Sequence, residues 1–179
     1  MYKLTLPAGQ DVLKKLRAGD TVAVSGVIYT GRDAAHKRMY KMIQEGNGLP
    51  FDLYAIYYTG PCPAPPGGVI GSCGPTTSSR MDAYTPRLLD MGLKIMIGKG
   101  GRSPEVVEAM KRNGAVYLAA TGGAGALLAE SVRSCSVEAF PELGTEAVYR
   151  LEVVDFPAVV AIDSQGNNLY KIGPEKYKY

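Results

Sequence analysis

The stretch GPTTSSRMD, residues 74–82, places a row of hydroxyl groups directly before an arginine. Hydroxyls and loop N–H groups can donate hydrogen bonds to a carboxylate or phosphate, and Arg80 can grip such an anion with two parallel hydrogen bonds. The alternative is an ordinary turn rich in Ser and Thr, in which Ser78 or Ser79 caps the following helix. The residue types alone leave both interpretations open.

A second cation follows a glycine in YTGRDAAH, residues 29–36, where a strand is expected to end and a helix to begin. Arg32 at the start of a helix opposes the helix dipole, which favours anions there. Its position makes sense if Arg32 and the free backbone N–H groups meet an anionic ligand together. The alternative is a surface arginine that pairs with Asp33 or another carboxylate. His36 fits a buried, hydrogen-bonded side chain as well as a ligand-facing one.

A third cation, Lys99, stands between glycines in GKGGR, residues 98–102. The spacing of a nucleotide-binding phosphate loop is absent, but a lysine at a strand end suits a single anionic group. Together Arg32, Arg80 and Lys99 suit a small dicarboxylate, with one cation left to orient it. No obvious acid–base pair and no Lewis acid accompany them, so the chain resembles half of an active site.

Metal binding by the chain itself is poorly supported by the sequence. Its three cysteines, Cys62, Cys73 and Cys135, form no CxxC pair, and a cluster held by these three thiolates is the weaker alternative. Cys73, beside Gly74, is a candidate for the wall of the site. We therefore expect no metal ligands in this chain.

The composition of the chain argues against two classes of binding partner, nucleic acids and membranes. The 179 residues carry a net charge of +3 without a Lys/Arg block, so we expect no nucleic-acid partner. No apolar run approaches the roughly 20 residues that span a bilayer, and the start of the chain lacks signal-peptide features. We expect a cytoplasmic protein with no membrane partner.

The expected elements alternate between strands and helices and then give way to strands alone. Ser103 as cap, Pro104 in the first turn and Gly114 as terminator give the clearest helix. The pattern predicts one α/β domain over residues 1–179, with a mixed sheet or two small sheets and flanking helices. The expected strands are 2–6, 21–30, 52–58, 69–72, 93–101, 115–121 and three segments within 136–163; the expected helices are 11–16, 32–45, 81–92, 103–114 and 122–132.

Three motifs, YTGRDAAHKRM, GPTTSSRMD and IGKGG, resemble in order and spacing the β subunit of two-subunit class I fumarases and the related L(+)-tartrate dehydratase β subunits. The resemblance covers nearly the whole chain and corresponds to the C-terminal domain of single-chain members. It implies a swivelling β/β/α domain with mixed sheets, and reversible hydration of fumarate to (S)-malate. It also implies a [4Fe–4S] cluster on a partner α subunit, an active site between the subunits of a heteromer such as α2β2, and no activity without the α subunit.

The resemblance further implies roles for individual residues. Arg32 and Arg80 bind the substrate carboxylates, Lys99 adds a third positive contact, and Thr76 matches the family's proposed catalytic threonine. The remaining candidates beside them are Asp33, His36 and Thr77. Because fumarases and tartrate dehydratases share these motifs, tartrate stays an alternative substrate. A non-catalytic dicarboxylate-binding domain is the alternative from another class.

Overall fold

The computed structural model describes residues 1–175 and residue 178. Its strands are β1 (Tyr2–Thr5), β2 (Thr21–Thr30), β3 (Ala55–Tyr57), β4 (Ile95–Gly98), β5 (Val116–Ala119), β6 (Val132–Ala139) and β7 (Val148–Ile162). Its α-helices are α1 (Gln10–Leu13), α2 (Asp33–Gln44), α3 (Thr85–Asp90), α4 (Pro104–Asn113), α5 (Gly125–Ala129) and α6 (Leu169–Glu175). Two 3-10 segments, η1 (Ser78–Met81) and η2 (Pro141–Glu146), complete the regular structure.

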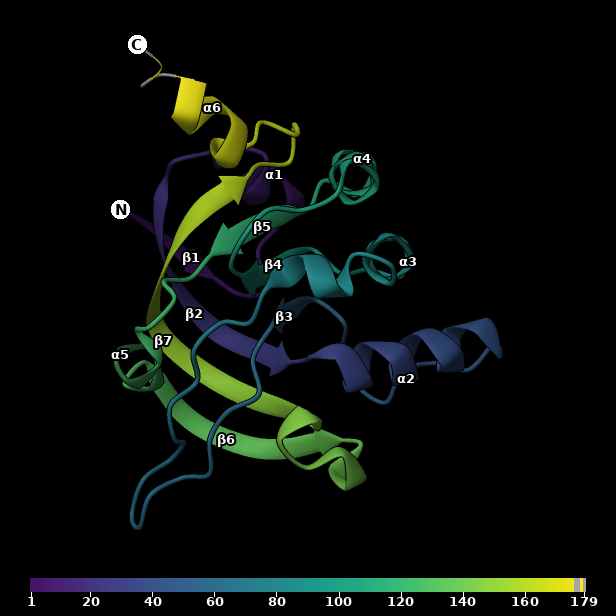
Figure 1. The fold of residues 1–179 in the computed structure, drawn as a ribbon, viewed down its shortest axis with the longest axis vertical. Helices are drawn as coiled ribbons and strands as arrows, with labels where there is room; N and C mark the ends of the chain where they lie inside the picture. The colour runs from purple at the N-terminus through teal and green to yellow at the C-terminus, as the bar shows by residue number, and fades with distance from the viewer. Residues whose placement is uncertain (176–177, 179) are drawn as a thin grey trace.

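The strands form one sheet that closes on itself. β1 to β5 lie parallel in chain order, and the long strand β7 runs antiparallel to both β5 and β2. This double pairing closes a ring of β2, β3, β4, β5 and β7 (Figure 1). β6 pairs with the first part of β7, from Val148 to Val153. The prediction of a mixed sheet with flanking helices is confirmed, and the alternative of two small sheets is wrong. The swivelling β/β/α character stays a prediction.

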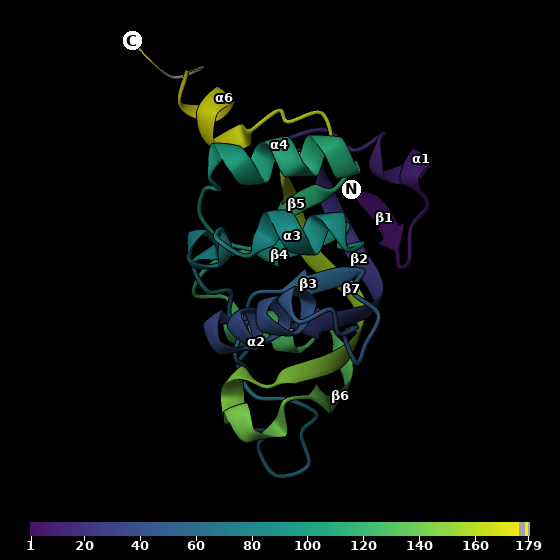
Figure 2. The same ribbon diagram turned by 90° about the vertical axis from the view of Figure 1, so that its right-hand side faces the viewer.

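Helices α2, α3 and α4 stack along one face of the parallel strands (Figures 1 and 2). Successive strand residues point to opposite faces, so in β4 the side chains of Ile95 and Ile97 enter one core cluster and that of Met96 enters the cluster beneath the helices. All three are fully buried, which explains why this strand reads as a continuous apolar run. No helix in the described part of the chain has the length and apolarity needed to cross a membrane.

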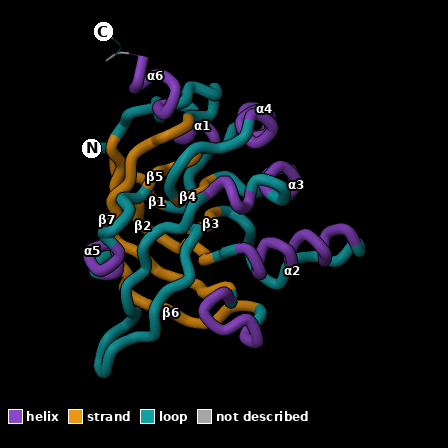
Figure 3. The backbone as a smooth tube through the Cα atoms, viewed as in Figure 1, coloured by secondary structure: helices purple, strands orange, loops and turns teal. Residues whose placement is uncertain are grey.

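The expected strand at residues 69–72 is absent. The segment between β3 and α3 is mostly a long loop that runs out past β6 and back (Figure 3). Around the expected strand, the two arms of this loop pair with each other: Cys62 N–H donates to the Ser72 carbonyl, and Gly71 N–H donates to the Cys62 carbonyl. Residues 69–72 themselves contain no proline, but Pro61, Pro63, Pro65 and Pro66 on the opposite arm of the loop lack the N–H groups that a longer ladder between the two arms would need.

Helix predictions hold best where the caps are strong. The Ser103 hydroxyl accepts from Val106 N–H, Pro104 opens α4, and Gly114 ends it with a φ of 61°. The expected helix over 81–92 instead divides into η1 and the short α3, whose first turn contains Pro86. The expected helix over 122–132 shortens to α5, because β6 already begins at Val132.

The prediction that the chain ends in strands alone is wrong, because α6 follows β7. β7 is also one strand where two were expected. Pro157 lies inside it, opposite Ala23, although a proline normally interrupts a sheet. β7 has a bulge in which Val154 and Asp155 lie opposite the single residue Ser25 of β2. This bulge and the left-handed backbone of Asp155 (φ 52°) bend the pair locally and let pairing continue on both sides.

Candidate functional site

The three predicted motifs meet at one edge of the sheet. Arg32 follows the carboxyl end of β2, and Lys99 follows that of β4; because β2, β3 and β4 are parallel, these ends share an edge. The GPTTSSRMD loop is attached to the same edge. Thr76 N–H donates to the Tyr58 carbonyl at 2.7 Å, and Ser78 N–H donates to the Lys99 carbonyl at 2.9 Å. The structure therefore brings the predicted hydroxyls and cations together.

Ser78 anchors the GPTTSSRMD loop and does not cap a helix. Its buried hydroxyl lies 2.8 Å from the Tyr117 hydroxyl, which in turn donates to the Gly100 carbonyl. A Cβ at Gly98 would overlap with Ser78 Oγ, so the close approach of loop and strand requires glycine there. Thr77 precedes the 3-10 turn, which no side chain caps. The alternative in which Ser78 or Ser79 caps the following helix is therefore wrong: both serines lie in the first turn of η1, and neither side chain caps η1 or α3.

Arg32 and Arg80 each contact a carboxylate. Arg80 Nε lies 2.9 Å from Asp33 Oδ1, and Arg32 Nε lies 3.2 Å from Glu146 Oε1 and 4.0 Å from Asp33 Oδ2. The Arg32 stem packs on the backbone just after β3, since a Cβ at Gly60 would lie 3.0 Å from Arg32 Cδ. The carboxylate pairing expected as an alternative for Arg32 is therefore present, and it leaves the ends of both guanidinium groups for a ligand.

His36 is a buried structural side chain. Its Nδ1 lies 2.8 Å from the Arg32 carbonyl; because a carbonyl oxygen only accepts, Nδ1 carries the proton and donates. Burial lowers the pKa of His36 to about 4, which keeps the ring neutral. Its ring meets that of Tyr58 edge-on with centroids 5.4 Å apart, inside the cluster beneath α2. His36 thus supports the turn that carries Arg32 and does not face a ligand.

The remaining predicted residues offer free polar groups at this edge. Thr76 is half-buried, whereas Thr77 and Lys99 are exposed. Thr76 Oγ1 forms no hydrogen bond to any of the residues that the structure describes. The Lys99 side chain extends over the loop after β5. A Cβ built at Gly122 in that loop would lie 3.6 Å from Lys99 Cδ and 3.8 Å from its Nζ. A ligand at this edge would meet hydroxyl donors and cations from several strand ends.

Two residues at the edge that carries the candidate site were not predicted from the sequence. Arg102 is buried and pairs with Asp82, between the rings of Tyr58 and Tyr117 at 5.2 and 5.1 Å from their centroids. This pair could have been suspected from the sequence, because GPTTSSRMD ends in Asp82 and GKGGR ends in Arg102, which carry opposite charges. Glu146, the partner of Arg32, lies on η2 and had no local signal, because only the tertiary structure brings η2 to α2.

Cys73 does not line the candidate site. Its side chain is fully buried in the other core cluster, and burial raises the pKa of its thiol to about 11. Over residues 1–175 and 178, no group of three or more His, Cys, Asp or Glu side chains is arranged to hold a metal ion.

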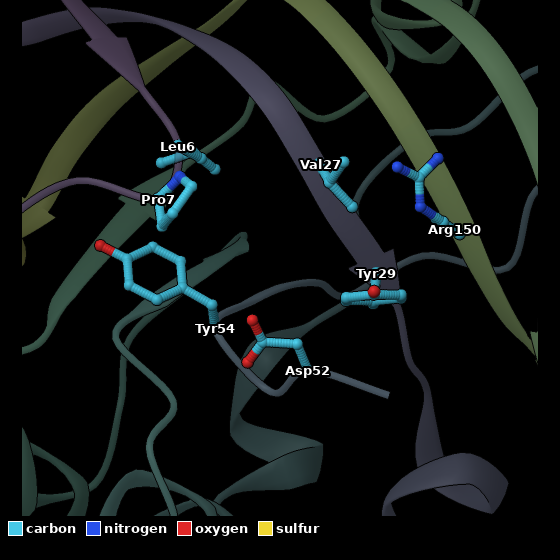
Figure 4. Close-up of a pocket in the computed structure, with 7 residues that line it drawn as sticks. All are labelled: Leu6, Pro7, Val27, Tyr29, Asp52, Tyr54 and Arg150. Atoms are coloured by element: carbon cyan, nitrogen blue, oxygen red, sulfur yellow. The ribbon is translucent and has the colours of Figure 1, made fainter. Parts of the chain in front are cut away.

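A cavity of about 260 Å³ lies elsewhere, beside β2 in the gap between its pairing with β1 and its pairing with β3. In Figure 4, Pro7 and Tyr54 line one side of it, and Tyr29 and Arg150 line the other. None of the predicted site residues lines this cavity. The candidate site is instead an open edge of the protein.

Comparison with known proteins agrees with the motifs. The family model described as Fumarase C-terminus matches residues 2–173. The chain is 42% identical to the aerobic class I fumarate hydratase of Escherichia coli K12 over 154 residues, and 41% identical to fumarate hydratase 2 of Leishmania major over 162 residues. These alignments cover 84% and 88% of this chain but only 28% of each relative.

A relative of similar length is the "Putative L(+)-tartrate dehydratase subunit beta" of Methanocaldococcus jannaschii. It is 42% identical over 167 residues, and the alignment covers 89% of this chain and 86% of the relative. The chain therefore spans less than a third of the length of these two fumarate hydratases, but most of the length of the tartrate dehydratase subunit.

Proposed function

Because the chain belongs to the fumarase C-terminus family, we propose that it is the β-type part of a class I fumarate hydratase, which reversibly adds water to fumarate to give (S)-malate. The L(+)-tartrate dehydratase β subunit is the second candidate. It is favoured by the relative of similar length, whose name describes a β subunit. Both candidates are hydro-lyases that act on four-carbon dicarboxylates.

The observation that carries this proposal is the meeting of Arg32, Arg80 and Lys99 with Thr76 at one open edge. A four-carbon dicarboxylate has a negative group at each end, and guanidinium groups bind carboxylates in a planar, two-point geometry. In the proposal, the two arginines hold the two carboxylates and Lys99 adds a third positive contact that orients the substrate. The double bond then lies among the hydroxyls of the GPTTSSRMD loop.

Thr76 is the residue proposed to move a proton. Hydration attaches a hydroxyl group to one carbon of the double bond and a proton to its neighbour, and dehydration removes both. A threonine hydroxyl is a very weak acid, so proton transfer through it requires cations or N–H groups that stabilise the oxyanion. Thr76 is half-buried, and it shares its loop with Arg80. We place the proton transfer to and from carbon at this oxygen.

The proposal requires a second subunit. Among the described residues of this chain, no acid–base group is hydrogen-bonded to Thr76 Oγ1, and no group of side chains is arranged to hold a metal ion. We propose that a partner α subunit carries a [4Fe–4S] cluster, which supplies Lewis-acid chemistry when bound, and that it covers the open edge. The described residues of this chain do not form a ligand set for that cluster.

Reconstitution tests the proposal. The chain alone and the chain assembled with a cluster-bearing α subunit from the same genome are assayed anaerobically with fumarate, malate and L(+)-tartrate. We expect no turnover by the chain alone and turnover by the assembly, with the larger kcat/KM identifying the substrate. Hydration by the chain alone without iron would sink the shared-site proposal. An inactive assembly in which the chain still binds dicarboxylates by calorimetry would favour a non-catalytic binding domain.

A further inference from the structure

Both arginines of the candidate site are contacted by carboxylates, but in different ways. Arg80 Nε donates a hydrogen bond to Asp33, whereas Arg32 Nε is buried and forms an ion pair with Glu146 without a hydrogen bond among the described residues. The contact runs through Nε in each case: Arg32 Nε to Glu146 Oε1 at 3.2 Å, and Arg80 Nε to Asp33 Oδ1 at 2.9 Å. Asp33 also approaches Arg32, with Oδ2 4.0 Å from its Nε. The four side chains therefore alternate in charge, in the order Glu146, Arg32, Asp33 and Arg80.

The position of these contacts on the guanidinium group matters. A guanidinium carries five N–H donors in a fixed planar fork, and a carboxylate can bind it from the side, at Nε, or at its end, through Nη1 and Nη2. The carboxylates occupy the Nε side. Neither Nη atom of Arg32 or Arg80 forms a hydrogen bond to another residue within the described part of the chain. The end of each fork remains available.

We propose that Glu146 and Asp33 are positioning residues that hold Arg32 and Arg80 by Nε, so that the ends of both forks receive the two carboxylates of the substrate. This inference rests on the proposed function. An arginine side chain has many rotamers, and holding it before the ligand arrives removes part of the ordering cost of binding. The carboxylates also screen the two arginines from each other, while Lys99 stays unpaired among the described residues.

The two pairs are unequal. The side chains of Arg32 and Glu146 are 29% and 26% exposed, whereas those of Arg80 and Asp33 are 50% and 37% exposed. Solvent weakens the more exposed pair, so Glu146 is expected to be the more important positioning residue. It also ties η2 to the start of α2, which joins two parts of the chain that are remote in sequence.

A matched pair of variants tests the role of Glu146. Glu146→Gln removes the charge but keeps a similar shape. Glu142→Gln changes an exposed carboxylate on the same segment. This carboxylate pairs with Arg38 at a distance of 3.7 Å and contacts neither arginine of the candidate site. In the assembled protein we expect Glu146→Gln to raise KM about tenfold with kcat within about threefold, the pattern of lost ground-state binding. Glu142→Gln is expected to leave both constants unchanged.

Two further measurements separate positioning from a merely structural role. In an Arg32→Lys background, Glu146→Gln should add less than about a twofold effect, because it acts through the fork that lysine lacks. Calorimetry of the assembled protein with succinate, which binds without turnover, should show about tenfold weaker binding for Glu146→Gln. The succinate affinity of Glu142→Gln should equal that of the wild type. Wild-type-like KM and succinate affinity for Glu146→Gln, or an equal effect in both backgrounds, would overturn the inference.

The outcomes also separate this inference from the proposed function. An assembly that binds succinate in the expected pattern but has no hydro-lyase activity overturns the function and supports the positioning role. An active assembly in which Glu146→Gln behaves like Glu142→Gln overturns the positioning role and supports the function.

Discussion

Asp82 and Arg102, the last residues of GPTTSSRMD and GKGGR, form a buried ion pair with Asp82 Oδ1 2.7 Å from Arg102 Nε. The Asp82 carboxylate also accepts from Ser103 N–H, and Arg102 Nη2 donates to Thr85 Oγ1. The pair therefore joins the hydroxyl loop, the strand-end loop after β4 and the start of α4. It holds the two motifs in place beneath the candidate site.

Asp82→Asn is expected to destabilise the fold strongly. It leaves Arg102, whose side chain is 0% exposed, without its counter-charge. Breaking one side of such a buried pair costs about 3–5 kcal/mol. The measurement is the free energy of unfolding from denaturant titration. The matched control is Asp90→Asn, because Asp90 pairs with the exposed Arg112 and its loss should cost about 1 kcal/mol or less. Equal losses in the two variants would contradict the structural role of the buried pair.

Gly98→Ala is expected to displace the GPTTSSRMD loop. The new Cβ would overlap with Ser78 Oγ and lie 2.8 Å from Tyr58 Cδ2, so loop and strand must separate. Overpacking of this kind costs about 1–3 kcal/mol. Gly101→Ala in the same loop is the control, because nothing lies within 4 Å of its Cβ. Denaturant unfolding of both variants checks this, and an unperturbed Gly98→Ala would argue against the close approach.

Thr76→Val should lower kcat by about a hundredfold or more in the assembled enzyme, because general acid–base groups contribute that much. The affinity for succinate should change little, since the carboxylate-binding cations remain. Thr76→Ser keeps the hydroxyl and should retain most of the activity. Thr21→Val, at the exposed start of β2, is the matched control. A Thr76→Val enzyme with normal kcat would exclude this hydroxyl from proton transfer.

Arg80→Lys should preserve the fold and weaken substrate binding by about tenfold to a hundredfold, because lysine cannot reproduce the planar fork. The half-exposed Arg80 side chain allows the substitution without a cavity. Steady-state kinetics of the assembled enzyme provide the measurement. Arg133→Lys, an exposed position on β6, is the control. Unchanged kinetics for Arg80→Lys would exclude Arg80 from carboxylate binding.

Acid should destabilise the protein through His36. Its pKa falls from 6.5 in the unfolded chain to about 4 in the folded protein, so the unfolded chain binds the proton first as pH decreases. This contribution to stability is complete above the unfolded value and is lost as pH falls from about 6.5 to about 4, by about 2 kcal/mol between pH 7 and pH 5. Unfolding free energies measured across this range should therefore decline. His36→Gln cannot titrate and should remove this part of the slope; an unchanged slope would assign it to other groups.

The local features of the candidate site could be predicted from short stretches of the sequence. A glycine beside a cation at the end of an apolar strand indicates an exposed turn, and this placed Arg32 and Lys99 correctly at strand ends. Strong caps located α4 to within a residue of its ends. These features depend on neighbouring residues, so they can be recognised without knowledge of the remaining chain. The motifs likewise identified the family that the comparisons found.

The contacts between distant segments could not be predicted in this way, because they depend on how the whole chain packs. The closure of the ring depends on β7 pairing with both β2 and β5, and no local pattern states which edges a strand will join. The Ser78 hydroxyl could cap a helix or bond elsewhere, and packing against Tyr117 selected the second. Glu146 reaches Arg32 only because η2 lies against α2. Long-range partners are set by the packing of the whole chain, whereas turns and caps are set by sequence neighbours.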